Sequence, residues 1–345
     1  MTSKTGSTKI RYQSTLNPPT FAQATGGAIV MTGGLLYLWK TYTSAEACIV
    51  DPVECLSDLS GADPWGRQVV LTVLMCLSLW LVSVLNKSEH GGSDPSIVDR
   101  LWSICPVVYT WHFALSNENY KTNPRLAAMV VCVSAWGLRL TYNFYIKGGF
   151  SGGEDYRWEM IRKWFPGWQW EVFNFVFICI YQQLLILGFS APAVAAMNSS
   201  APWGMTDTAA MALFLALLCG EATADAQMFA FQTEKYRRIN NNEPLKEYSK
   251  GFIDTGLWAY SRHPNYFCEV SMWWSIYLFS VGATGSALNW SILGVVFLTM
   301  LFLVPETGSL DCGEYLSSGK YKQYADYQKR VSKFIPWFPS KASSD

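Results

Sequence analysis

Apolar segments close to membrane-spanning length constrain this chain more than any other feature. A transmembrane helix needs about 20 mostly apolar residues, and several of the segments are somewhat shorter than that. The segments cover residues 21–40, 68–85, 101–116, 126–146, 172–197, 208–231, 265–282 and 290–304. They predict an all-α fold, a polytopic transmembrane helix bundle of about eight spans.

Lysine and arginine are distributed unevenly between the two sides of this bundle. With the N-terminus in the cytoplasm, the cytoplasmic connections carry 21 of the 26 basic residues and the external connections carry 3. Lys40 and Arg139 lie within apolar segments. Because cytoplasmic loops of membrane proteins are enriched in Lys and Arg, the pattern predicts an even number of spans and two cytoplasmic termini.

The composition agrees with a membrane protein and excludes several other classes. Only 15% of the residues are charged, whereas soluble domains average about 25%. Together with 16 tryptophans, this argues against a soluble enzyme, a disordered chain and a nucleic-acid-binding protein. Lys plus Arg and Asp plus Glu each number 26, so net charge favours no partner. With three histidines and no CxxC pair, we expect no metal site.

No internal repeat or low-complexity linker divides the chain. We expect one continuous membrane domain, in which residues 1–95 add two less specific spans to the region 96–345. Cys48 and Cys55 lie in the first external loop, either as a disulfide or as two free thiols. Asn198 begins an Asn-Ser-Ser glycosylation sequon on the same side.

A few ionisable residues interrupt the apolar segments. Such groups are costly in a membrane and usually face a cavity or one another. They are Arg139, Glu221, Asp225 and Glu269, with Glu306 just after the last segment. One interpretation is structural: Arg139 pairs with Glu221 or Asp225, and Glu269 reaches the interface. The alternative, which the grouping near the cytoplasmic side favours, is a polar chamber open to that side.

The segment 250–275 carries the densest group of functional side chains. Arg262, His263 and Asn265 surround Pro264, which suits the first turn of a helix. A helix N-terminus next to an arginine can bind an anion. Basic residues precede it at Lys235, Arg237, Arg238, Lys246 and Lys250. A phosphate-rich ligand would complement this charge, and ordinary cytoplasmic anchoring is the alternative explanation for the lysines.

This segment also carries a family resemblance. GLWAYSRHPNYFCE closely resembles the signature of an uncharacterised membrane family that adjoins the steroid 5-alpha-reductases and sterol reductases. The resemblance covers most of the chain after about residue 95. It includes SIVDRLW with Asp99, WGLRL with Arg139, GGEDYRW with Asp155, EATADAQ with Asp225, and the closing YADYQKRVSKFIPW.

The resemblance implies NADPH bound in a cytoplasmic-facing chamber of the helix bundle. Asn265 and Glu269 match an Asn-x-x-x-Glu pair that lines the nicotinamide and substrate region, and Asp225 matches an acid close to the nucleotide. His263, Arg262 and Arg139 join the implied cofactor site. The implied cover over the diphosphate is the tail, with Tyr324, Tyr327, Lys329, Arg330 and Lys333.

Three departures from the family pattern concern the same site. Cys268 replaces the glycine before the glutamate, and Tyr142 stands where a histidine is usual. Gln232 replaces a frequent lysine, so Lys235, Arg237 or Arg238 is expected to bind the 2′-phosphate of NADPH.

The expected reaction is reduction of a carbon–carbon double bond in a steroid, sterol, polyprenol or acyl lipid. Its proton donor would be Tyr142, Tyr266 or Glu269, because a phenol or a buried carboxylic acid can donate. The alternatives are an S-adenosylmethionine-dependent membrane methyltransferase and a non-enzymatic membrane subunit. The endoplasmic reticulum is the default location, with a mitochondrial or plastid membrane as alternatives. Apart from the bilayer and a lipophilic substrate, no partner is implied.

Overall fold

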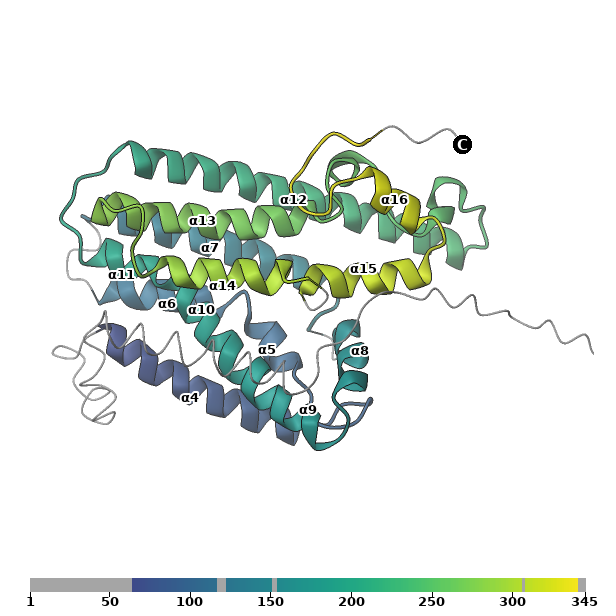
Figure 1. Cartoon of the computed structure of the whole chain (residues 1–345), viewed down its shortest axis with the longest axis horizontal. Coiled ribbons are helices and arrows are strands. Elements are labelled where there is room, and N and C mark those ends of the chain that lie inside the picture. Colours follow the sequence, from purple (N-terminus) through teal and green to yellow (C-terminus); the bar gives the residue numbers. More distant parts are fainter. Residues whose placement is uncertain (1–63, 117–121, 151–153, 306–307, 341–345) are drawn as a thin grey trace, which may run out of the picture. The chain divides into compact units, whose positions relative to one another are not determined.

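The structure is a computed structural model that describes residues 64–116, 122–150, 154–305 and 308–340 (Figure 1). The expected span 21–40, the pair Cys48 and Cys55, and Glu306 lie outside the described residues. The same holds for Lys40, at the end of the first expected span.

The described residues are helical and contain no β-strand, which confirms the all-α prediction for this part of the chain. Two isolated bridges, Lys87 with Ser93 and Ser261 with Ser332, are the extended pairings found there. The N-terminal helices are α4 (Pro64–Leu85), α5 (Ser96–Leu101), α6 (Cys105–Leu115), α7 (Pro124–Ile146) and α8 (Tyr156–Trp164). A run from Trp168 to Met197 comes next as α9 (Trp168–Phe173), the π-helix η1 (Asn174–Tyr181), α10 (Gln182–Ser190) and α11 (Pro192–Met197).

The C-terminal half begins with the longest helix. The elements are α12 (Met205–Asn240), η2 (Lys246–Lys250), η3 (Gly256–Ala259), α13 (Pro264–Thr284), α14 (Ile292–Leu303), α15 (Ser309–Lys320) and α16 (Tyr324–Arg330). At 1.5 Å per residue, the 36 residues of α12 extend about 54 Å. The helix therefore continues past the expected span 208–231 into the region expected to be a cytoplasmic loop.

Among the described residues, four helical segments are long and apolar enough to cross a membrane: α4, α7, the run Trp168–Met197 and α12. They correspond to four of the expected spans. In the expected span 101–116, α5 ends at Leu101 and only the 11 residues of α6 are α-helical after it, with Pro106 in the first turn of α6. The 12 residues of α14 rise only about 18 Å, less than the roughly 30 Å hydrocarbon core. The 21 residues of α13 are long enough, but that helix is not among the four candidates.

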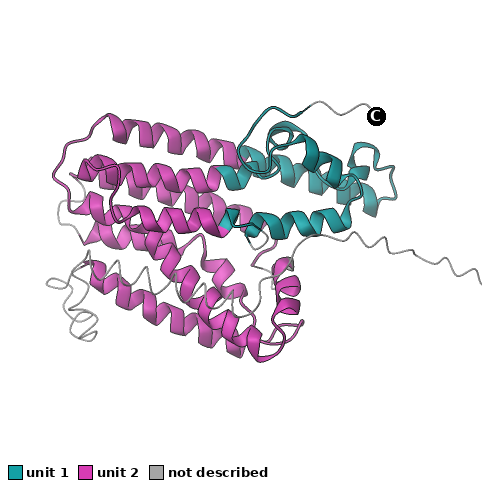
Figure 2. Ribbon diagram, in the orientation of Figure 1, with its two compact units in different colours: residues 1–18, 223–267, 302–345 teal, residues 19–222, 268–301 magenta. Residues whose placement is uncertain are grey.

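Two compact units divide the chain (Figure 2). The tail unit contains the described residues of 223–267 and 302–345, and the bundle unit contains those of 19–222 and 268–301. The boundaries between the two units fall inside α12, α13 and α14, and none of them lies near residue 95.

The bundle unit is held together by close helix contacts. The helix α6 packs against α7, and α10 packs against both α4 and α6. Gly294 of α14 lies directly against the backbone at Gly188 of α10, in a space that a Cβ atom would fill. A side chain at Gly294 would therefore push these two helices apart.

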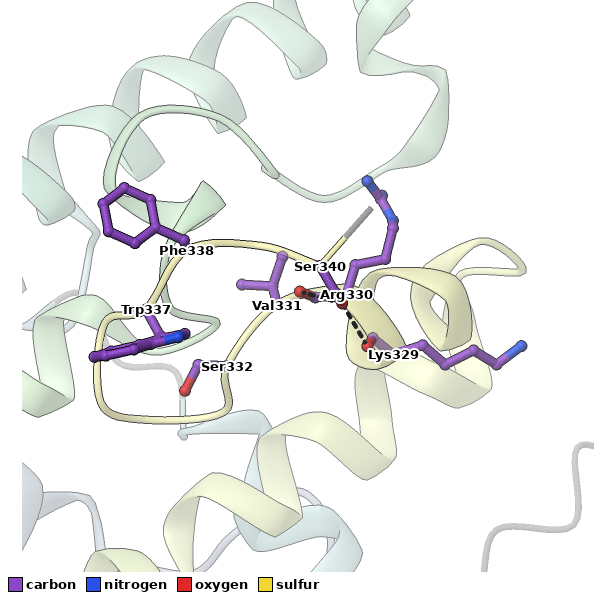
Figure 3. Close-up of a pocket in the computed structure, with 7 residues that line it drawn as sticks. All are labelled: Lys329, Arg330, Val331, Ser332, Trp337, Phe338 and Ser340. Carbon is purple, nitrogen blue, oxygen red and sulfur yellow. Dashed lines mark hydrogen bonds between the residues drawn. The ribbon is translucent and has the colours of Figure 1, made fainter. Parts of the chain in front are cut away.

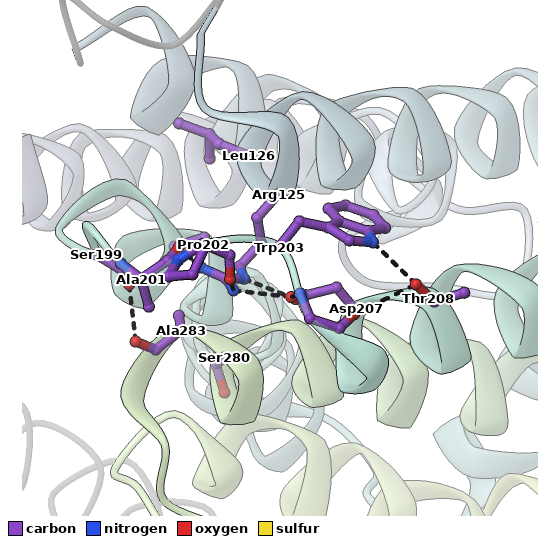
Figure 4. Close-up of polar contacts among 12 residues, drawn as sticks. Arg125, Leu126, Ser199, Ala201, Pro202, Trp203, Asp207, Thr208, Ser280 and Ala283 are labelled. Atoms are coloured by element: carbon purple, nitrogen blue, oxygen red, sulfur yellow. Dashed lines mark hydrogen bonds and ion pairs between the residues drawn. The ribbon is translucent and has the colours of Figure 1, made fainter.

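A buried ion pair fixes the start of α7 to the start of α12 and the segment before it (Figure 4). The Arg125 guanidinium donates to both carboxylate oxygens of Asp207, at 2.6 and 2.8 Å, and also to the carbonyls of Ala201 and Pro202. The backbone N–H of Gly204 donates to Asp207 as well. Because each charge is hydrogen-bonded as well as paired, the pair can be buried without orphaned groups.

The tail unit is closed by hydrogen bonds between the 256–263 loop and the C-terminal segment. The Tyr327 hydroxyl donates to the carbonyl of Trp258, and the backbone N–H of Arg262 donates to the carbonyl of Ser332. The Ser261 hydroxyl donates to the carbonyl of Phe334. The C-terminal loop itself surrounds a small pocket of about 350 Å³, lined in part by Ser332, Trp337 and Ser340 (Figure 3).

Candidate functional site

Glu269 is a buried carboxylate with two indole donors. Its side chain is 6% exposed on α13, within the bundle unit. The Trp136 Nε1–H donates to one carboxylate oxygen at 2.7 Å, and the Trp273 Nε1–H donates to the other at 3.2 Å. The two indole rings contact each other edge to face at 4.9 Å. This geometry orients both oxygens with neutral donors, so Glu269 does not reach toward an interface.

Arg139 and Glu221 lie beside this carboxylate. Arg139 Nη2 is 2.5 Å from Glu221 Oε1, and both side chains are largely buried. Both residues also interact electrostatically with Glu269. The sequence left open whether Arg139 binds a cofactor or pairs with Glu221, and in the structure it pairs. Two carboxyl groups beside one guanidinium form a cluster that can hold a proton.

Tyr142 of α7 is exposed, unlike Glu269. It is 64% exposed and lines a groove of about 630 Å³ together with Val107, Leu138, Tyr145 and Phe150. The rest of the lining is also uncharged, and its hydroxyls include the hydrogen-bonded pair Ser103 and Thr141. Of these two alternative proton donors, Tyr142 is therefore exposed in an apolar groove, whereas Glu269 is buried.

In the tail unit, Arg262 and His263 converge on a residue that the sequence analysis missed. Glu314 accepts from Arg262 Nε at 2.5 Å and from Arg262 Nη2 at 3.1 Å, and His263 Nε2 lies 3.2 Å from it. Gln328 Nε2 also donates to this carboxylate at 3.1 Å. Burial alone would raise the pKa of Glu314, but the His263 hydrogen bond and the Arg262 charge outweigh it, and the pKa lies below its usual value.

The Arg262 guanidinium is fully engaged rather than directed at open space. Besides Glu314, it donates to the carbonyls of Gln328 and Val331. It was expected as an anion ligand, whereas in the structure it connects the 256–263 loop to α15 and α16. A signal for Glu314 was available, because a buried arginine needs an acid and Glu314 lies within the region of the chain that resembles the family.

The first turn of α13 places Asn265, the last residue of the RHPN motif, and Tyr266, which follows it. The Tyr266 ring stacks on His263 at 5.7 Å and contacts Phe302 at 5.1 Å. Asn265 is partly exposed, and no other described residue hydrogen-bonds its side-chain amide. With two donors and one acceptor available, this amide can bind a ligand.

The predicted phosphate ligands on α12 have different surroundings. Arg237 forms ion pairs with Glu234 and Glu243, and Arg238 pairs with Glu234 and donates to the carbonyl of Pro244. Hydrogen bonds from both arginines lower the pKa of Glu234 to about 2. Lys235, in contrast, is 5% exposed and donates to the carbonyl of Gly251 at 3.0 Å.

Most of the remaining predicted cofactor residues are buried or paired with another side chain. Asp225 is buried on α12. Tyr324 and Tyr327 are also buried, and both rings pack against Phe252, at 5.1 and 5.2 Å. Lys333 pairs with Asp311 at 2.5 Å.

Arg330, the last predicted cofactor residue, lines the pocket of Figure 3. Its Nε donates at 3.4 Å to the carbonyl of Asp326. Within the described ranges, no group of three metal-ligating side chains was found.

Two of the family-like motifs meet in the bundle unit. Asp99 of SIVDRLW accepts a 2.7 Å hydrogen bond from Trp158 Nε1 of GGEDYRW. Burial raises the pKa of Asp99 to about 7, despite this bond. Glu154 of the second motif pairs with the buried Arg162 at 2.8 Å. These motifs are therefore linked to each other by buried polar contacts.

Comparison with known proteins supports the family assignment without naming an activity. Residues 79–331 match DUF1295, a family of proteins of unknown function, and this range contains both Glu269 and Glu314. An uncharacterised protein of Schizosaccharomyces pombe is 34% identical over 285 residues, which cover 79% of this chain and 80% of the relative. No solved structure matches the chain. The chain therefore belongs to the DUF1295 family.

Proposed function

We propose that this protein is a membrane-embedded NADPH-dependent reductase of a carbon–carbon double bond in a lipophilic substrate. The proposal rests on one observation above the others: α13 carries a buried, indole-bound Glu269 one turn after Asn265, whose amide no described residue hydrogen-bonds. Residues four apart lie on the same face of a helix. The resemblance of this segment to the steroid 5-alpha-reductases supplies the proposed reaction.

The proposed cofactor is a phosphorylated dinucleotide. In the proposal, the Asn265 amide binds the carboxamide end, and the cations of the tail unit hold the phosphates. The cofactor would supply the hydride. The tasks left to the chain are to orient the substrate, exclude water and deliver a proton.

Glu269 is the proposed proton donor or the group that positions it. Its carboxyl oxygens are held by Trp136 and Trp273, so the orientation of the acid is determined before a substrate binds. The adjacent pair Arg139 and Glu221 provides a second carboxyl group with which the proton can be shared. Tyr266 is the alternative donor, and its stacking on His263 limits its movement.

The proposed arrangement in the membrane goes beyond the four candidate spans. We propose eight spans with both termini in the cytoplasm, because the 21-to-3 distribution of basic residues favours that alternation. The endoplasmic reticulum membrane is the proposed location. Glycosylation reporters inserted after each apolar segment test the topology, and modification of a C-terminal reporter would contradict it.

A thermal-shift titration of detergent-purified protein tests the activity class. NADPH is expected to raise the melting temperature, while S-adenosylmethionine leaves it unchanged. A shift with S-adenosylmethionine alone would favour the methyltransferase alternative, which shares an Arg-His-Pro motif. If neither ligand shifts the transition, and NADPH fluorescence also detects no binding, the non-enzymatic alternative is favoured.

A further inference from the structure

Two lysines of the tail unit lie against the same tyrosine ring. The Lys235 ammonium is 5.9 Å from the centre of the Tyr321 ring, and the Lys320 ammonium is 5.4 Å from it. Tyr321 packs directly on Gly251, whose carbonyl accepts from Lys235. The two ammonium groups are thus brought together by residues far apart in the sequence.

Neither lysine has a carboxylate partner among the described residues. The surroundings of the Lys235 ammonium are instead aromatic, with Tyr236 at 4.9 Å and Phe231 at 5.8 Å. Burial of the ammonium group lowers the pKa of Lys235, and repulsion from Lys320 lowers it further. A buried cation without a counter-ion is costly, and an anion between the two lysines would remove that cost.

The neighbouring arginines are less available than the two lysines to bind an anion, because each is already paired with a carboxylate. Arg237 is bridged to Glu234 and Glu243, and Arg238 to Glu234. An arriving phosphate would have to displace these carboxylates before it could bind either guanidinium. The lysine pair has no such competitor among the described residues.

We propose that Lys235 and Lys320 form a phosphomonoester site that binds the 2′-phosphate of NADPH. This inference rests on the proposed function and assigns the preference for NADPH over NADH to the lysine pair. A 2′-phosphate is a dianion near neutral pH and is absent from NADH, so two ammonium groups without a carboxylate partner distinguish the two nucleotides. The ring of Tyr321 lies within 6 Å of both ammonium groups and can contact the attached ribose.

The test compares Lys320→Met with Lys322→Met in the full-length, detergent-purified protein. Both side chains are exposed, so neither change should prevent folding, and Lys322 is the matched control. Lys320→Met is expected to weaken NADPH binding roughly 10-fold or more while NADH binding changes less than 2-fold. Lys322→Met should leave the ratio of the two dissociation constants unchanged. An equal effect of Lys320→Met on both nucleotides, or no effect, overturns the site.

A second measurement separates failure of the site from failure of the proposed function. Lysine acetylation with peptide mass spectrometry measures whether 2′,5′-ADP protects Lys320, with 5′-AMP and Lys322 as controls. Protection of Lys320 by 2′,5′-ADP without any NADPH binding would retain the site and reject the reductase. NADPH binding without protection would retain the reductase and reject the site. Protection seen only in nanodiscs containing phosphatidic acid would assign the site to a lipid and overturn the proposal.

Discussion

The two buried glutamates of this protein differ in what surrounds them. Glu314 accepts from an arginine, a histidine and a glutamine, and these hydrogen bonds join three segments of the tail unit. Glu269 accepts from two neutral indoles in the bundle unit. A carboxylate saturated by charged donors is stabilised as an anion, whereas neutral donors orient a carboxyl group without committing it to that form. The comparison supports a structural role for Glu314 and is consistent with the chemical role that the proposed function gives Glu269.

The largest expected effect is on turnover. Glu269→Gln keeps the side-chain size but removes the titratable proton, so the reduction rate should fall by roughly 10²- to 10⁴-fold. NADPH binding should remain, as measured by fluorescence titration. Glu314→Gln is the matched control and should leave the turnover of folded protein nearly unchanged. If Glu269→Gln lowers only stability, the carboxylate is a packing group and the comparison fails.

The second effect is on stability and concerns the other glutamate. Glu314→Gln removes the counter-charge of the buried Arg262, which should cost about 3–5 kcal/mol of unfolding free energy. Denaturant unfolding in detergent measures this change. Glu159→Gln is a suitable control, because Glu159 pairs with Lys163 at an exposed position. If the Glu314→Gln protein is as stable as wild type, the hydrogen bonds from Arg262 to backbone carbonyls are enough to stabilise its buried charge.

The pH dependence of stability should also follow Glu314. Its pKa is lower in the folded protein than the ordinary value of 4.5. The stabilisation is therefore complete above pH 4.5 and is lost as the pH falls through the folded-state pKa. Melting temperatures of wild type and Glu314→Gln, measured from about pH 7 to about pH 3, should converge at the acidic end. Parallel curves would contradict the assigned role.

The smallest effect is expected at Asn265, one turn before Glu269. Asn265→Ala removes a neutral hydrogen bond to the nucleotide, so the NADPH dissociation constant should rise about 2- to 10-fold. The unfolding free energy should hardly change, because no described residue hydrogen-bonds this amide. Asn241→Ala serves as an exposed control. Unchanged binding would separate Asn265 from the nucleotide and weaken the proposal for α13.

Much of the local structure could be predicted from the sequence. The segments 68–85, 126–146, 172–197 and 208–231 all appear as long apolar helices, because helix length and apolar composition are local properties. The break at Ser103 and Ile104 before α6 was missed, since it comes after a helix of only six residues. The length of α12 was underestimated because polar residues continue the same helix beyond Phe231.

The pairing of charged side chains could not be predicted in the same way. The sequence offered Glu221 and Asp225 as partners for Arg139, and only packing selected Glu221. The partners Arg125 and Asp207 lie 82 positions apart, and Trp136 donates to a carboxylate 133 positions away. No sequence spacing specifies such contacts.

The sequence by itself determined that this protein is helical, apolar and rich in membrane-length segments, and that its RHPN motif precedes a helix. These properties follow from composition and periodicity over a few turns. Only the tertiary structure decided that Arg262 is engaged by Glu314, that Glu269 is held by two indoles, and that Lys235 lies near Lys320 without an acid partner among the described residues. The physical reason is that a buried charge is stabilised by whichever groups packing brings to it, and packing joins residues that are distant along the chain.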